Sequence, residues 1–89
     1  MKSAEIVIIN KLGLHARAAA KLVQLSSQFH SEISLIKDGE TADAKSIMEV
    51  LMLAGTQDSR LRIVTKGSDE TQALEEIKQL INNRFEEEE

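Results

Sequence analysis

A change of hydrophobic period marks the segment KSAEIVIINKLGLHARAAAKLVQLSSQF, residues 2–29. Residues 2–9 alternate and are rich in β-branched side chains, which is typical of a strand. A loop containing Gly13 follows, and from His15 onward apolar side chains recur every three or four positions, as on one face of an amphipathic helix. The apolar positions of these two predicted elements are Ala4, Ile6 and Ile8, and then Ala18, Leu22, Leu25 and Phe29.

Three further segments have the alternation of strands. Residues 32–37 and 40–43 flank Asp38 and Gly39, a pair suited to the positive φ angles of a tight hairpin turn. Residues 60–66 alternate again and stop at a glycine. The sequence therefore predicts four strands, two of them joined as a hairpin.

Two more helices are predicted between and after these strands. Ser46 and Glu49 have the spacing of a capping box, so a helix is expected to begin there and to end near Gly55. Residues 68–70 place a cap and two acids before a second helical pattern that continues to Arg84. The order strand, helix, strand, strand, helix, strand, helix predicts an α+β fold in which helices cover one face of a four-stranded antiparallel sheet.

Length and composition limit the classes of function. The 89 residues supply one core, so we expect a single domain over residues 1–85, followed by a solvated acidic tail at residues 86–89. A net charge of −4 and only two aromatic residues argue against nucleic-acid binding. The absence of cysteine fits the cytoplasm, and no apolar run approaches the ~20 residues of a membrane span, so membrane insertion is not expected.

The loop-to-helix junction around His15 carries the chemistry. If His15 caps the helix, the backbone amides of Ala16 and Arg17 point outward and the helix dipole adds positive charge. That field disfavours imidazolium, so the ring keeps a free lone pair that can attack phosphorus, while the Arg17 guanidinium suits phosphoryl oxygens. The alternative is a histidine that merely begins a helix and faces water, and composition and spacing alone favour it.

Two motifs resemble signatures of the HPr family, the small histidine phosphocarriers of the bacterial phosphoenolpyruvate-dependent phosphotransferase system. They are NKLGLHAR, residues 10–17, and KSIM, residues 45–48. The order of elements also matches the family's open-faced β-sandwich over residues 2–85. The start of the first motif and the Phe-Glu-Glu of residues 85–87 resemble the nitrogen-branch members in particular, and both the sugar and the nitrogen branch stay open.

The resemblance implies a carrier and not an enzyme. By it, His15 is phosphorylated on Nδ1 by enzyme I or its nitrogen-branch equivalent, Arg17 steadies the phosphoryl group, and an enzyme IIA protein receives it. No cofactor and no metal is implied, and a monomer is expected. One residue departs from the family pattern, because Ala18 stands where a proline is usual. This change is expected to loosen the start of the helix by a fraction of a kcal/mol, up to ~1 kcal/mol.

The second predicted helix contains a candidate phosphorylation site and candidate residues for docking of partner proteins. Ser46 matches a position that HPr kinase/phosphorylase modifies in part of the family, but a helix cap paired with Glu49 is the simpler interpretation. The helix is apolar on more than one face, so some of its side chains must be exposed. The resemblance assigns a surface for partner proteins next to the His15 end, made of Ala20, Ile47, Met48 and Leu51.

Basic residues are expected around the site in an otherwise acidic chain, where they could steer acidic partners. These are Arg17, Lys21, Lys45 and Lys11. His30 lies near the end of the first predicted helix, and neither a catalytic role nor a two-histidine metal site is expected for it. Two rival functions remain open: a regulatory paralogue that acts through the apolar surface, and a small module whose Gly13 loop binds an anion.

Overall fold

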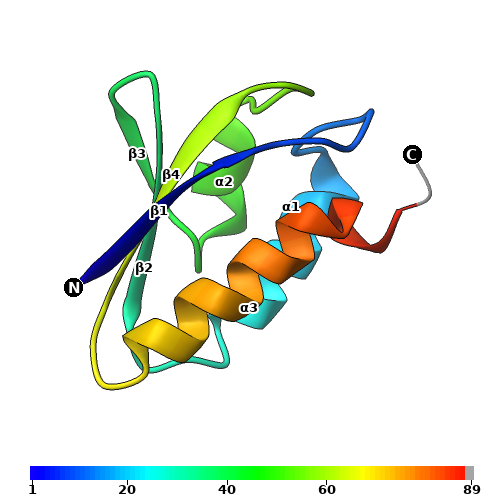
Figure 1. Ribbon diagram of the computed structural model, residues 1–89. Helices are drawn as coiled ribbons and strands as arrows, with labels where there is room; N and C mark the ends of the chain where they lie inside the picture. The colour runs from blue at the N-terminus through cyan, green and yellow to red at the C-terminus, as the bar shows by residue number, and fades with distance from the viewer. Residues whose placement is uncertain (88–89) are drawn as a thin grey trace.

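The computed structural model describes residues 1–87, and its elements follow the predicted order (Figure 1). The prediction of an α+β fold is confirmed. The strands are β1 (Lys2–Val7), β2 (Glu32–Lys37), β3 (Glu40–Asp43) and β4 (Arg60–Lys66). The helices are α1 (Ala16–Ser26), α2 (Ile47–Met52) and α3 (Glu70–Asn82), and a 3-10 turn, η1 (Arg84–Glu86), follows α3.

The four strands form one antiparallel sheet in the order β1-β4-β2-β3. The hairpin of β2 and β3 turns at Asp38 (φ 51°) and Gly39 (φ 82°), which confirms the turn that the sequence predicts. β4 lies between β1 and β2 and pairs Ile63 with both Ala4 and Leu35. The apolar side chains of alternating strand positions consequently meet on one face of the sheet.

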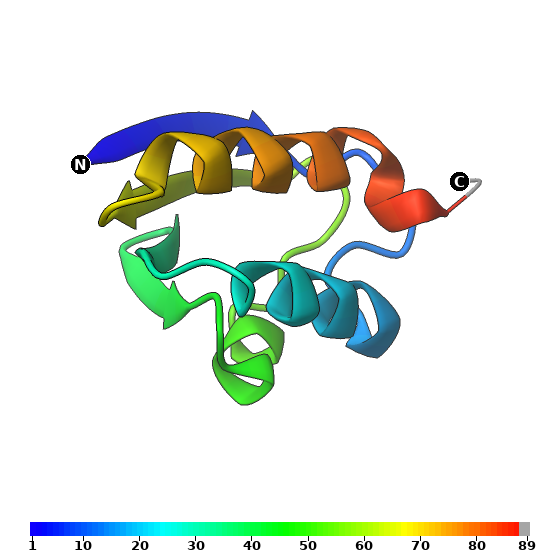
Figure 2. The same cartoon turned by 90° about the horizontal axis from the view of Figure 1, so that it is seen from below.

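Helices cover that face and leave the other uncovered (Figures 1 and 2). α3 packs over β1 and β4, α2 packs against β3, and α1 lies against both helices. The buried core comes from every element, with Ile8, Leu22, Ile63 and Ile77 among its fully buried side chains. α1 therefore buries one side among helices and strands, which leaves its N-terminal end at the edge of the molecule.

Several element ends differ from the predictions. α1 ends at Ser26, so Phe29 joins the core from the turn beyond it, and β1 ends two residues before the predicted strand does. α2 ends at Met52, three residues short of Gly55, because Ala54 turns into the left-handed region (φ 53°). The helical pattern that reached Arg84 ends at Asn82.

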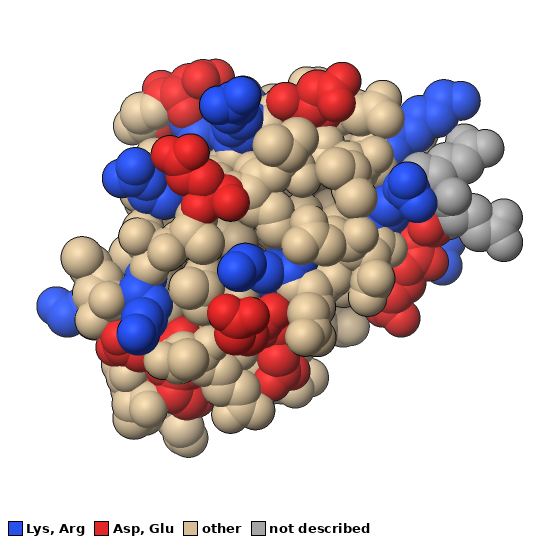
Figure 3. Space-filling model, viewed as in Figure 1, with Lys and Arg blue, Asp and Glu red and all other residues tan. Residues whose placement is uncertain are grey.

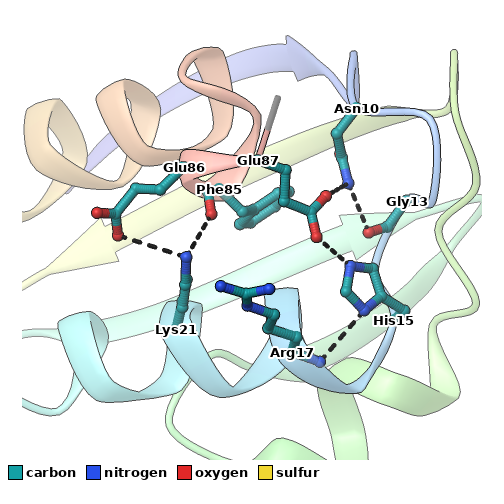
Figure 4. A network of polar contacts seen from close by, with 8 residues as sticks. All are labelled: Asn10, Gly13, His15, Arg17, Lys21, Phe85, Glu86 and Glu87. Carbon is teal, nitrogen blue, oxygen red and sulfur yellow. Dashed lines mark hydrogen bonds and ion pairs between the residues drawn. The ribbon is translucent and has the colours of Figure 1, made fainter. Parts of the chain in front are cut away.

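The C-terminal segment turns back onto α1. Arg84, Phe85 and Glu86 all have φ between 54° and 65°, and the Phe85 ring is fully buried. The buried ring of Phe85 fixes the direction of the chain that follows it, toward Glu87 (Figure 4). A solvated tail is the wrong description for Glu87, whose side chain is 13% exposed and contacts His15. Residues 88–89 of the predicted tail lie outside the described residues.

Candidate functional site

His15 occupies the N-cap of α1, as the change of hydrophobic period predicted. Its backbone is extended (φ −82°, ψ 178°), and its carbonyl accepts the first helical hydrogen bond, from the amide of Ala19 at 2.8 Å. The backbone N–H of Arg17 donates to Nδ1 of His15 at 3.3 Å. The ring nitrogen thus faces the positively polarised end of an eleven-residue helix.

A glycine in the loop before His15 allows that loop to lie close against the chain that follows α2. Gly13 has φ +65°, and a Cβ at that position would lie 2.4 Å from the carbonyl oxygen of Gly55. That carbonyl accepts a hydrogen bond from the amide of Leu14 at 2.7 Å. The loop before His15 is therefore held against the chain after α2, and the close contact requires glycine.

The other ring nitrogen of His15 is bound by Glu87. Nε2 hydrogen-bonds to Oε2 of the Glu87 carboxylate, 72 residues away along the chain (Figure 4). A backbone amide can only donate, so Nδ1 must present its lone pair to Arg17, and a carboxylate can only accept, so Nε2 must carry the hydrogen. Both contacts specify the same neutral tautomer of His15.

The Glu87 carboxylate is held in turn by Asn10, a fully buried side chain. Nδ2 of Asn10 donates to Oε1 of Glu87 at 2.8 Å and to the carbonyl of Gly13 at 2.9 Å. Desolvation raises the pKa of the Glu87 carboxyl, but the hydrogen bonds from Asn10 and His15, together with smaller effects of nearby positive charge, outweigh it and lower that pKa. Glu87 therefore stands as a carboxylate beside the imidazole ring.

The surface around His15 is partly open to solvent. The His15 side chain is 28% exposed, and Ala16 and Arg17 beside it are exposed. The alanines further along the helix are less accessible, because Ala18 and Ala19 are fully buried in the core and Ala20 is half-buried. The His15 ring is therefore partly accessible from solvent, on the side of Ala16 and Arg17.

The basic residues lie less tightly around His15 than expected. Figure 4 shows the Arg17 side chain extending toward the C-terminal segment, and Lys21 hydrogen-bonds there as well. Lys45 lies elsewhere, because its Nζ donates to the carbonyl of Phe29, beyond the opposite end of α1. Lys11 is exposed in the loop before Gly13. Basic and acidic side chains are interspersed on the face in Figure 3, so no large basic field forms there.

Ser46 caps α2, as predicted, and its Oγ accepts from the amide of Glu49 at 3.3 Å. The reciprocal half of the capping box is absent, since Glu49 accepts from the amide of Asp43 at 3.0 Å and not from Ser46. The predicted docking residues of α2 are exposed, at 44% for Ile47, 67% for Met48 and 39% for Leu51.

Some surface features were missed from the sequence. Met52 and Leu12 are also strongly exposed, at 73% and 68%. The roles of Asn10 and Glu87 at the ring had no signal in the sequence, because their contacts depend on how the chain ends pack. Among residues 1–87, no three His, Cys, Asp or Glu side chains gather as metal ligands would, and no helix there is long and apolar enough to cross a membrane.

Three comparisons with known proteins, by family model, by sequence and by structure, agree with one another. A family model described as "PTS HPr component phosphorylation site" matches residues 2–83. The chain is 48% identical over 85 residues to the phosphocarrier protein HPr of Cupriavidus necator, which covers 96% of each chain. A crystal structure of HPr from Thermoanaerobacter tengcongensis superposes with a TM-score of 0.96 at 42% identity, over the full length of both chains. A dimer of HPr from that organism superposes with a TM-score of 0.79 at 41% identity and covers 98% of this chain and all of its own.

Proposed function

This chain belongs to the HPr family and is a phosphocarrier of the phosphotransferase system, so we propose that His15 is the residue that carries its phosphoryl group. The single observation that carries this proposal is the N-cap position of a reachable imidazole whose Nδ1 lone pair faces the start of α1. The protein itself is not a catalyst; it is a substrate of the enzymes that load and unload it.

The chemistry of transfer follows from the two ring nitrogens. Nδ1 attacks phosphorus, the N–P bond forms, and the bond between phosphorus and the donor's leaving group breaks with its electron pair going to the donor. The phosphoryl oxygens then lie at the backbone amides of Ala16 and Arg17, where the helix dipole and the Arg17 guanidinium favour negative charge. The site is shallow, and this suits a group that must be surrendered to a second protein.

The partners of this cycle are enzyme I as donor and enzyme IIA proteins as acceptors. The exposed apolar side chains of α2 support this, because Ile47, Met48 and Leu51 are available to pack against another protein. We include Ala20 of α1, which is half-buried, in the same docking surface. Adaptable methionine suits a surface that meets several partners in turn.

Phosphorylation in vitro tests the proposal. The chain is incubated with phosphoenolpyruvate and enzyme I, and mass spectrometry follows the gain of one phosphoryl group, which should be labile in acid and stable in base. His15→Ala should abolish the gain, whereas His30→Ala should leave it intact. Retention of the modification in His15→Ala would refute the assignment.

A regulatory paralogue that acts only through the α2 surface is the second candidate. The exposure of that surface favours this candidate, but the candidate gives no role to the partly exposed imidazole of His15 beside Arg17. Use of Ser46 by a kinase competes with its hydrogen bond to the Glu49 amide, so we regard Ser46 as a cap.

We take the working state to be a monomer. Sedimentation at micromolar concentration checks this against the dimer seen in a relative.

A further inference from the structure

We propose that Glu87 is the positioning residue of His15: its carboxylate keeps the ring hydrogen on Nε2 and stabilises the positive charge that the ring gains on phosphorylation. The inference deepens the proposed function and rests on it. Its basis is the chain of contacts from Asn10 to Glu87 to His15 in Figure 4.

The contact is with the nitrogen that does not react. Glu87 binds Nε2, and Nδ1 faces the amide of Arg17 on the other side of the ring. The carboxylate therefore orients the imidazole without occupying the path of the incoming phosphorus. Without it, only the amide of Arg17 favours a lone pair on Nδ1, and in the competing Nδ1–H tautomer that nitrogen has no lone pair for the attack.

The fold holds the carboxylate from several directions. Asn10, fully buried, uses Nδ2 to bind Oε1 of Glu87, and the same nitrogen is fixed by the carbonyl of Gly13. The amide of Glu87 donates to the carbonyl of Arg84 at 2.9 Å. Glu87 is thus a tethered group and not a freely moving end of the chain.

The anchor of this segment is Phe85, whose ring is fully buried and whose carbonyl accepts from Lys21 Nζ at 2.9 Å. Three successive non-glycine residues, Arg84 to Glu86, adopt left-handed backbone angles to seat that ring. Such angles are unfavourable for these residue types and persist only where the surrounding contacts impose them. The turn is what directs Glu87 back over the start of α1.

The transfer then proceeds without moving a ring proton. The lone pair of Nδ1 forms the N–P bond. The ring then becomes a phosphorylated imidazolium whose hydrogen is still on Nε2, facing the Glu87 carboxylate. When the phosphoryl group leaves, the electron pair of the N–P bond returns to Nδ1 and the neutral ring is restored in the same tautomer. A fixed negative charge at Nε2 favours the charged adduct and the transition states on either side of it.

The test compares Glu87→Gln with Glu86→Gln in the full chain. Both variants remove one negative charge from the same turn, but Glu86 is 68% exposed and pairs with Lys21 at 3.8 Å, away from the ring. Two readouts are used: the tautomer of His15, from ¹⁵N NMR of the unphosphorylated protein, and the rate of loading by enzyme I at saturating concentration of this chain. Thermal unfolding checks that both variants fold.

Glu87→Gln removes the charge and leaves one acceptor oxygen for the two donors, Asn10 and His15. We expect it to reduce the fraction of the Nε2–H tautomer and to slow loading about tenfold, the low end for a hydrogen bond to a charged group, with little change in KM. Glu86→Gln should behave as wild type in both readouts. An unchanged tautomer and rate in Glu87→Gln, equal slowing by the two variants, or faster loading by Glu87→Gln would each overturn the inference. Failure of wild-type His15 to be phosphorylated would instead refute the proposed function, while the tautomer comparison, which needs no transfer, would still decide whether Glu87 positions the ring.

Discussion

Nζ of Lys21, in the middle of α1, donates a hydrogen bond to the backbone carbonyl of Phe85 at 2.9 Å, across 64 residues of chain. The same amino group lies 3.8 Å from the Glu86 carboxylate. The contact joins the helix that presents His15 to the segment that presents Glu87, so the Lys21 side chain adds a further link between the two halves of the site (Figure 4).

Removal of this tie should cost stability. Lys21→Met keeps the apolar stem but loses the donor, and the half-buried carbonyl of Phe85 loses its partner. We expect the free energy of unfolding in urea to fall by about 1 kcal/mol. Lys78→Met is the matched control, because Lys78 makes only a surface ion pair with Glu75 at 3.8 Å, and it should change stability by less than about 0.5 kcal/mol. Equal effects of the two variants would contradict a specific tie.

Alanine substitutions at two glycines distinguish the stability cost of backbone strain from the cost of a steric clash. Gly13→Ala and Gly39→Ala both place a Cβ at positive φ, but the new Cβ would meet Gly55 and Thr56 backbone atoms at position 13 and nothing within 4 Å at position 39. Gly39→Ala should cost about 1 kcal/mol, the typical strain of a left-handed alanine. Gly13→Ala should cost clearly more, since the backbone must move as well. Thermal unfolding measures both, and similar costs would refute the close contact.

The pH dependence of stability should reflect Asp69. Hydrogen bonds from the Ser31 hydroxyl and from the His30 and Ser31 amides lower the pKa of Asp69 to about 2 in the folded chain, against the raising effect of desolvation. The unfolded value is near 4. A lowered folded pKa contributes stability that is present above pH ~4 and is lost as the pH falls toward 2.

Urea unfolding between pH 5 and pH 2 checks this expectation. Asp69→Asn should be less stable than wild type at pH 5 and should lose less stability as the pH falls. Asp38→Asn, at a carboxylate that is 86% exposed, should keep the wild-type dependence. A parallel pH curve for Asp69→Asn and wild type would show that Asp69 contributes nothing to acid sensitivity.

The α2 surface can be tested with two methionines that are about equally exposed. Met48 lies in the predicted docking set, whereas Met52 lines a groove toward β3 with Thr41 and Leu53. Met48→Ser should raise the KM for loading by enzyme I about tenfold, as loss of an interface hot spot does. Met52→Ser should leave it unchanged, and both variants should fold with wild-type stability. A reversed order of effects would move the docking surface to the other side of α2.

The cap of α2 offers a direct test of the structural role of Ser46. Ser46→Ala removes the acceptor for the Glu49 amide and should lower the free energy of unfolding by about 1 kcal/mol. Ser46→Asp keeps an acceptor and a favourable charge at the helix start, so it should be close to wild type. If Ser46→Ala is as stable as wild type, the cap contributes nothing and Ser46 needs another explanation.

The features that could be predicted from the sequence are those formed between near neighbours along the chain. The alternation of β4, the Asp38-Gly39 turn, the Ser46 cap and the place of His15 at the start of α1 all depend on residues within a few positions of one another. Short-range hydrogen bonds and hydrophobic periods favour these local structures, so the sequence around each of them carries the signal. The position of His15 at a helix start could therefore be predicted from spacing, whereas its role as a phosphocarrier residue was indicated only by the resemblance to the HPr family.

Only the tertiary structure decided which distant groups meet. Asp69 shows the difference: it is the N-cap residue of α3, yet its carboxylate makes no cap bond, because the packed fold brings the amides of His30 and Ser31 to it. The strand order β1-β4-β2-β3 and the contact of Glu87 with His15 are of the same kind. Side-chain polar groups bind whichever partner the packed core places within reach, and the position of that partner depends on the whole chain, including the burial of Phe85.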